Sequence, residues 1–198
     1  LGFRGEALAS IGMVSKLSIS SRPLGTEGCR IVMDNGDKGK TEPAGIAEGT
    51  CIEVSHIFIN QPARLAFQRR PATETSRIVD VVVSHAISHP EVGFRLVSDE
   101  KIILEVPAVD EMEDRLYDIL GRQAGRMIEI SSPSSDDDAP GDENWRGWIS
   151  TPDITRGKGD DIHILINGRP VAAQPFLQSI RRGYRTRLMQ GRHPVAVL

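Results

Sequence analysis

The sequence predicts an α+β protein built from two domains. Alternating apolar and polar residues indicate strands, and apolar residues spaced three or four apart indicate helices. These segments follow one another without the regular alternation of a doubly wound fold, and the sequence contains no internal repeat. With 39% hydrophobic residues but only 5% aromatic ones, the 198-residue chain is expected to bury mostly aliphatic side chains.

The first predicted domain covers residues 1–108. A glycine-punctuated turn leads into a helix that starts at Glu6, and alternation then predicts strands over 16–22, 29–33 and 49–57. A helix is expected from a cap at Thr73 or Thr75 to about residue 88, although its valines also suit a strand. A hairpin over 94–98 and 102–106 completes the domain.

The second predicted domain covers residues 109–198, after a linker over 107–110. We expect helices over 114–120 and from 175 to about 189, with Phe176, Ile180 and Tyr184 on one face of the latter. Strands are predicted over 145–150, 161–167 and the last four residues, and an exposed acidic loop over 131–144. Because the chain begins with Leu and ends within an apparent strand, we expect it to be part of a longer protein.

The composition and the charge distribution limit the kinds of functional site that we expect in this chain. The net charge of -3 does not indicate a nucleic-acid-binding protein as a whole, yet arginines gather between residues 181 and 192, which permits one basic face. Cys29 and Cys51 fit neither a metal site nor a disulfide framework, and the five histidines form no ligand-spaced set. We therefore assign no catalytic residue and no metal ligand to this chain. No apolar run is long enough for a membrane span.

The first motif is the string from Leu1 to Ile11, a glycine-rich turn that feeds a helix N-terminus. Such a turn suits a phosphate, although spacing alone more often reflects turn geometry, and the string is not a Walker A loop. As a string, it resembles the third nucleotide-binding motif of the MutL family, within the GHKL ATPases. The resemblance implies that the ATP lid is formed by Gly2, Phe3, Arg4, Gly5, Glu6, Ala7 and Leu8.

Two further strings carry the resemblance. Gly49-Thr50 opens a predicted strand and looks like the fourth motif of these ATPases, which implies that Thr50 lines the adenine pocket. Residues 57–67 resemble a family string in which Phe58, Asn60, Pro62, Ala63, Arg64 and Phe67 match. Ile59 and Gln61 depart from it and remove polar groups. We expect Arg64 to have a structural role.

Candidate DNA contacts are basic residues near these motifs and in the second domain. They are Arg69, Arg70, Arg169, Arg181, Arg182 and Arg185. A Val-Asn-Gly-Arg turn of the family is similar to Ile166–Arg169, but Ala172, Ala173 and Gln174 stand where the family often has basic residues. For Arg69, Arg70 and the arginines after residue 180, a solvated surface is an equally good interpretation.

The resemblance implies a fold and a function. The fold is the C-terminal part of a GHKL (Bergerat) ATPase α/β sandwich, followed by a transducer domain of the ribosomal-protein-S5 domain 2-like fold. The function is DNA mismatch repair by an ATP-dependent clamp that dimerises through its N-terminal region, binds DNA and receives signals from a MutS-type mismatch-recognition protein. The location implied is cytoplasmic, or nuclear if eukaryotic.

The cofactors implied are ATP and Mg2+. The family's general base and its Mg2+ ligand belong to an earlier helix that is not in this sequence, so we expect the chain alone not to hydrolyse ATP. Two other interpretations stay open: a topoisomerase-type GHKL ATPase subunit, and a non-enzymatic module that binds nucleic acid or another protein.

Overall fold

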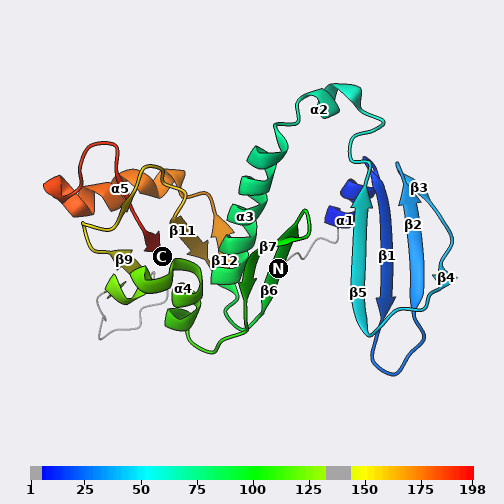
Figure 1. The fold of residues 1–198 in the computed structure, drawn as a ribbon, viewed down its shortest axis with the longest axis horizontal. Coiled ribbons are helices and arrows are strands. Elements are labelled where there is room, and N and C mark those ends of the chain that lie inside the picture. The colour runs from blue at the N-terminus through cyan, green and yellow to red at the C-terminus, as the bar shows by residue number, and fades with distance from the viewer. Residues whose placement is uncertain (1–5, 133–143) are drawn as a thin grey trace. The chain divides into compact units, whose positions relative to one another are not determined.

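A computed structural model describes residues 6–132 and 144–198, in which helices and strands mix in an α+β fold, as the sequence predicts (Figure 1). The predicted lid residues Gly2, Phe3, Arg4 and Gly5 lie outside the described residues, as does most of the predicted acidic loop. The chain forms two compact units, unit 1 (Leu1–Arg70) and unit 2 (Pro71–Leu198).

Unit 1 contains an antiparallel sheet with one apolar face. Strands β3 (Asp37–Lys38), β2 (Cys29–Asp34), β1 (Lys16–Arg22) and β5 (Gly49–Ser55) lie in this order, and β4 (Glu42–Pro43) pairs with β2. Because side chains alternate along a strand, Leu17, Ile19 and Ser21 of β1 share one face. Cross-strand register adds six residues to what we call the apolar sheet face: Met33, Ile31 and Cys29 from β2, and Val54, Ile52 and Thr50 from β5.

Helix α1 (Glu6–Gly12) contacts this face through its last residue. A Cβ on Gly12 would lie 2.3 Å from Sδ of Met33 and 3.3 Å from Leu17, so a larger residue would require the Met33 side chain to move. The buried Ser15 hydroxyl donates to the Ile11 carbonyl at 2.7 Å and closes the helix end. The buried Gly12 therefore lies directly against Met33 and Leu17 of the apolar sheet face.

Unit 2 begins with the long helix α3 (Pro71–Ser88), which contacts the hairpin of β6 (Phe94–Ser98) and β7 (Lys101–Val106) and also helix α4 (Met112–Leu120). The hairpin turn places Asp99 and Glu100 at positive φ, as a tight two-residue turn requires. A 3-10 helix, η1 (Gly121–Arg126), follows α4. The predicted hairpin and the predicted helix after residue 110 are both present.

The sheet of unit 2 has the order β12–β11–β14–β9–β8. Its strands are β8 (Met127–Ser131), β9 (Arg146–Ser150), β11 (Ile162–Ile166), β12 (Arg169–Val171) and β14 (Ala196–Val197). Neighbours pair antiparallel except β11 and β14, which are parallel. One core cluster joins Ile87 of α3, Leu116 of α4, Trp148 and Val197, and a second lies around Ile162, Ile164 and Ala196.

Helix α5 (Gln174–Tyr184) lies in unit 2 and is shorter than predicted. It ends at Tyr184, and the 3-10 helix η2 (Arg185–Arg187) follows it. The helix packs through Leu177 and Ile180 against the second cluster, and Tyr184 is buried, whereas Phe176 is 37% exposed. The prediction is confirmed for Ile180 and Tyr184 and wrong for Phe176, whose place on the packed face Leu177 takes, because spacings of three and four alternate along a packed helix.

Several elements depart from the predictions. Helix α3 starts at Pro71 rather than at a Thr73 or Thr75 cap, because proline suits the first turn of a helix. The short helix α2 (Pro62–Ala66), the edge strand β8 and the two-residue strands β3, β4, β10 (Thr155–Arg156) and β13 (His193–Pro194) were not predicted, because short or edge segments carry weak periodicity. The two-residue strand β14 lies within the strand predicted for the last four residues. The compact units divide at Arg70, whereas the predicted domain boundary at 108/109 stays a prediction about the longer protein.

Candidate functional site

The described part of the predicted lid is the first turn of α1. Glu6, Ala7 and Leu8 begin this helix, and all three are exposed. The carboxylate of Glu6 lies in the first turn, where it interacts favourably with the helix dipole. The far end of α1 is anchored, because the Gly36 N–H donates to the Gly12 carbonyl at 3.0 Å. The lid residues therefore enter a helix that is fixed to the sheet at its other end.

The predicted adenine contact, Thr50, lies at the start of β5 and is exposed. Its hydroxyl lies 2.8 Å from the hydroxyl of Ser21, the residue opposite it on β1, so the two groups form a hydrogen bond. Both occupy the polar end of the apolar sheet face, about 13 Å along β1 from Leu17 at ~3.3 Å per residue. An apolar surface with hydroxyls at its edge suits a flat heterocycle such as adenine.

Ser21 is a candidate site residue that the sequence analysis missed. The sequence does contain a signal for Ser21, because this polar residue occupies a position of the alternating strand that is otherwise apolar. Which residue it faces depends on the register of β1 against β5, and that register joins residues 29 positions apart. Cys29 flanks Ser21 on the other side, whereas Cys51 faces Ser20 on the opposite face of the sheet, so the two exposed thiols point apart.

The string over residues 57–67 forms a turn and the short helix α2. Phe58 has a φ of 61°, and its N–H donates to the Val14 carbonyl at 2.7 Å, which fastens the turn to the segment after α1. The guanidinium of Arg64 lies over the Phe58 ring, 5.8 Å from its centre. Arg64 thus makes a cation–π contact within unit 1, in keeping with the structural role expected for it.

The candidate DNA-contacting arginines fall into two groups. Arg69 and Arg70 follow α2 at the end of unit 1 and are exposed. In unit 2, Arg181 and Arg182 lie in the last turn of α5, where their charge suits the helix dipole, and Arg185 follows at a φ of 51°. Arg182 and Arg185 are exposed and Arg181 is half-buried, while Arg169 is exposed in β12. Arg181, Arg182 and Arg185 are therefore close together along the chain.

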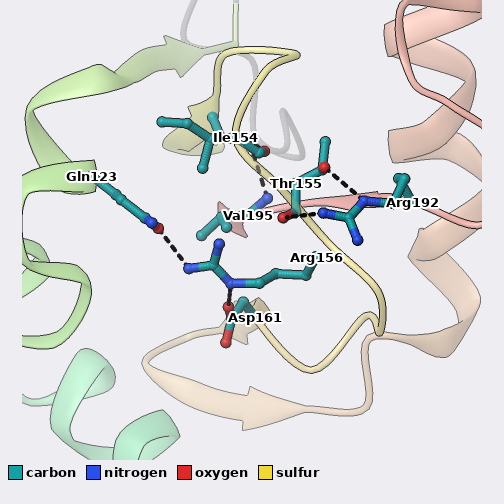
Figure 2. Close-up of polar contacts among 8 residues, drawn as sticks. Gln123, Ile154, Thr155, Arg156, Asp161, Arg192 and Val195 are labelled. Atoms are coloured by element: carbon teal, nitrogen blue, oxygen red, sulfur yellow. Dashed lines mark hydrogen bonds and ion pairs between the residues drawn. The ribbon is translucent and has the colours of Figure 1, made fainter.

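Two other arginines of unit 2 have structural partners (Figure 2). Arg156 donates to the Asp161 carboxylate at 2.5 Å and to the Gln123 side chain at 2.6 Å. Arg192 donates to both the hydroxyl and the carbonyl of Thr155, at 2.9 and 3.1 Å. These contacts tie the segment around residue 155 to its neighbours, and they give the exposed Arg192 hydrogen-bond partners within unit 2.

A polar contact joins α3 to β11. Nδ1 of the buried His163 lies 3.2 Å from the hydroxyl of Ser84, which itself donates to the Asp80 carbonyl at 2.8 Å. Burial lowers the pKa of His163, against the opposing fields of Asp161 and Asp80. Burial also raises the pKa of Asp80, helped by Asp160. The neutral imidazole therefore donates to the Ser84 oxygen, since the single hydroxyl proton is already used.

The described ranges contain no group of three or more His, Cys, Asp or Glu residues that could hold a metal ion. They also contain no helix that is long and apolar enough to cross a membrane. Thr50, Ser21 and the first turn of α1 remain the candidate nucleotide contacts among the described residues.

Known proteins resemble the whole chain. A family profile described as the C-terminal domain of DNA mismatch repair protein matches residues 116–198. Proteins named DNA mismatch repair protein MutL from Acidiphilium cryptum, Geobacillus kaustophilus and Halobacterium salinarum are 38%, 37% and 33% identical over the entire chain. The chain spans about a third of the length of these relatives, at 33%, 31% and 30%.

Solved structures agree in fold. The MutL ATPase domain of Aquifex aeolicus complexed with ADP superposes with a TM-score of 0.72 at 26% identity, over 98% of this chain and 71% of that one. The N-terminal domain of a DNA repair protein gives a TM-score of 0.78 over 100% of this chain and 62% of that one, and at 22% identity it supports the fold alone.

Proposed function

The chain belongs to the MutL family of DNA mismatch-repair proteins, and from this we propose that it serves as the nucleotide-responsive, DNA-binding part of an ATP-dependent clamp. In this proposal the complete protein binds ATP with Mg2+, dimerises through its N-terminal region and closes on DNA. A MutS-type protein then signals mismatch recognition to it, and downstream repair factors receive the signal.

The observation that carries the proposal is the hydroxyl pair of Thr50 and Ser21 at the polar end of the apolar sheet face. Thr50 is the residue at which the family motif implies an adenine contact, and the apolar side chains beside it offer a surface for the ring. Residues Gly2–Leu8 would form a lid over the phosphates when ATP binds. The phosphate contacts would come from backbone N–H groups and Arg4.

We propose that this chain binds and orients the nucleotide but supplies neither the general base nor the Mg2+ ligand. A bound Mg2+ would neutralise the phosphates, and its ligand would come from another part of the protein. The arginines at the end of α5, with Arg69, Arg70 and Arg169, would hold DNA by its phosphates and without base specificity.

The experiment measures the mass in solution of the full-length protein with and without a non-hydrolysable ATP analogue and magnesium. We expect a shift from monomer to dimer that Arg4→Ala or Gly5→Val abolishes. Thr50→Val should weaken analogue binding about five- to tenfold, the worth of about one hydrogen bond. Ser20→Ala is the matched control, because Ser20 neighbours Ser21 but points to the other face of the sheet.

Absence of both nucleotide binding and a mass shift would contradict the clamp and would leave a DNA-binding or interaction module. Equal weakening by Thr50→Val and Ser20→Ala would instead contradict the assignment of the nucleotide to the apolar sheet face. Turnover of ATP by the purified 198-residue chain would overturn the proposal that its general base lies elsewhere.

A further inference from the structure

Arg115, in the first half of α4, is a fully buried cation at 0% exposure. One nitrogen, Nη2, donates to three backbone carbonyls: those of Pro90 at 2.7 Å, Val92 at 2.8 Å and Pro107 at 2.7 Å. Since Nη2 carries two protons for three acceptors, at least one proton is shared. Among the residues that the structure describes, no carboxylate forms an ion pair with this guanidinium.

These carbonyls belong to the two ends of the β6–β7 hairpin. Pro90 and Val92 lie between α3 and β6, and Pro107 directly follows β7. The Val109 N–H also donates to the Pro90 carbonyl at 2.8 Å, and a Cβ on Gly93 would lie 3.4 Å from the Ala108 nitrogen. The segment expected to be a linker over 107–110 is therefore tied down. We call this set of contacts the Arg115 junction.

A buried guanidinium bound to neutral carbonyls is costly, and here Nε and Nη1 have no hydrogen-bond partner. An apolar residue would avoid that cost but would leave three carbonyls without this donor. The Arg115 junction therefore contributes less to the free energy of unfolding than to the relative placement of segments: it specifies where α3 ends relative to α4.

The position of the junction gives it a role. The chain leaves unit 1 at Arg70 and enters unit 2 at the first residue of α3, an 18-residue helix whose far end lies beside Pro90. A displacement of the start of α3 would be carried along this helix toward Pro90. Arg115 ties the exit of α3 to α4, and its neighbour Leu116 belongs to the core cluster of Trp148.

We infer that Arg115 is a positioning residue that transmits nucleotide-dependent movement from α3 and the hairpin to the second sheet. This inference rests on the proposed function, because it presupposes a nucleotide-driven closure. Arg115 touches neither nucleotide nor DNA in this scheme. Its substitution should therefore leave nucleotide binding intact and impair the dimerisation that follows it.

The test uses the full-length protein with three substitutions. Arg115→Met keeps much of the length of the side chain but cannot donate, Arg115→Lys keeps a donor, and Arg122→Met changes an exposed arginine of η1 as the control. Hydrogen exchange at the Val109 N–H reports the junction, and exchange at the Leu165 N–H, which donates to the Leu198 carbonyl at 2.7 Å, reports the rest of unit 2.

Arg115→Met should accelerate exchange at Val109 about tenfold or more and leave Leu165 unchanged, with Arg115→Lys intermediate and Arg122→Met silent. Its affinity for a fluorescent ATP analogue should stay within about twofold of the wild type, while the concentration needed for analogue-induced dimerisation should rise about tenfold. If Arg115→Met does not fold, the same comparison is made with Arg115→Lys.

Equal acceleration at Val109 and Leu165 would overturn the inference, because it would show a general loss of stability. Normal dimerisation with accelerated exchange at Val109 would also overturn it. If the wild-type protein neither binds the analogue nor dimerises, the proposed function is wrong. The exchange rates at Val109 and Leu165 still test the Arg115 junction in that case.

Discussion

At the scale of single residues, unit 2 is organised by buried polar groups with defined partners. The Tyr184 hydroxyl donates to the Ser150 carbonyl at 2.6 Å, and burial raises the pKa of this tyrosine. The Ser150 hydroxyl in turn donates to the Ile154 carbonyl and accepts from the Val195 N–H, a pair of hydrogen bonds in the region that Figure 2 shows. Buried polar groups that are satisfied in this way specify one arrangement of the segments they join.

His163 predicts a pH dependence of stability. Above its ordinary pKa of 6.5 the ring is neutral in both folded and unfolded chains. Below it, the unfolded ring takes up a proton that the buried ring resists, so stability should fall as the pH falls. When the pH is lowered from about 7.5 to about 5.5, the urea midpoint of the His163→Gln chain should fall less than that of the wild-type chain.

The control for this experiment is His85→Gln, which changes an exposed histidine of α3. It should keep the pH dependence of the wild-type chain. A His163→Gln chain that loses as much stability at acid pH as the wild type would exclude His163 as the cause.

A pair of glycine substitutions should have opposite effects. A Cβ on Gly147 would lie 2.1 Å from the Val197 carbonyl oxygen, whereas a Cβ on Gly183 of α5 would meet nothing within 4 Å. Gly147→Ala should therefore cost about 1–3 kcal/mol or more through overpacking. Gly183→Ala should stabilise by about 0.5–1 kcal/mol, because alanine favours the helix. Urea denaturation measures both, and a neutral Gly147→Ala would show that β9 and β14 can separate at little cost.

At the scale of elements, α5 combines an inner face of Leu177, Ile180 and Tyr184 with basic residues at its C-terminal end. Arg181 and Arg182 interact favourably with the helix dipole whether or not DNA is present. Their presence at this end has a structural explanation, so the DNA-binding role needs its own experiment.

The arginines of α5 and η2 should govern the salt dependence of DNA binding. Replacing Arg182 or Arg185 by Gln should weaken binding for all DNA sequences alike and reduce the salt slope by about 0.9 for each phosphate that the protein no longer neutralises. Arg122→Gln, in η1, should change neither. Binding of the full-length protein to duplexes of two unrelated sequences at several salt concentrations measures this, and an unchanged slope would assign these arginines to a solvated surface.

At the scale of the whole molecule, the two compact units of the structure divide between Arg70 and Pro71, whereas the sequence patterns predict a domain boundary at 108/109. Helix α3 and the hairpin β6–β7 contact α4, and α3 also contacts β12, so both belong with the second sheet. Ile87 of α3 completes the core cluster of Leu116, Trp148 and Val197. A fragment that lacks α3 would expose this cluster.

Truncation should therefore distinguish the two divisions. Residues 71–198 should unfold cooperatively, because they retain Ile87 and the three carbonyls bound by Arg115. Residues 109–198 should melt without cooperativity, because they lose both Ile87 and the segments that bury Arg115. Thermal melting followed by circular dichroism measures this, and a cooperative transition in the shorter fragment would favour the boundary at 108/109.

The motif strings assign Thr50 and the start of α1 to a nucleotide site by residue type and order, and these assignments stay predictions. The rest could not be predicted. Nothing in the order of residues reveals that Ser21 faces Thr50, that Arg192 is bound to Thr155, or that Arg115 is buried. Each of these outcomes depends on residues that lie far apart along the chain.

The local elements follow from the order of residues alone: the alternating strand β1, the hairpin β6–β7 and the helical stripe of α3. These depend on interactions between near neighbours, which periodicity records. The tertiary structure alone decided where α5 ends, which face of the sheet carries Thr50 and Ser21, and to which unit α3 belongs. Those outcomes depend on register and packing between distant segments, whose free energy no local pattern contains.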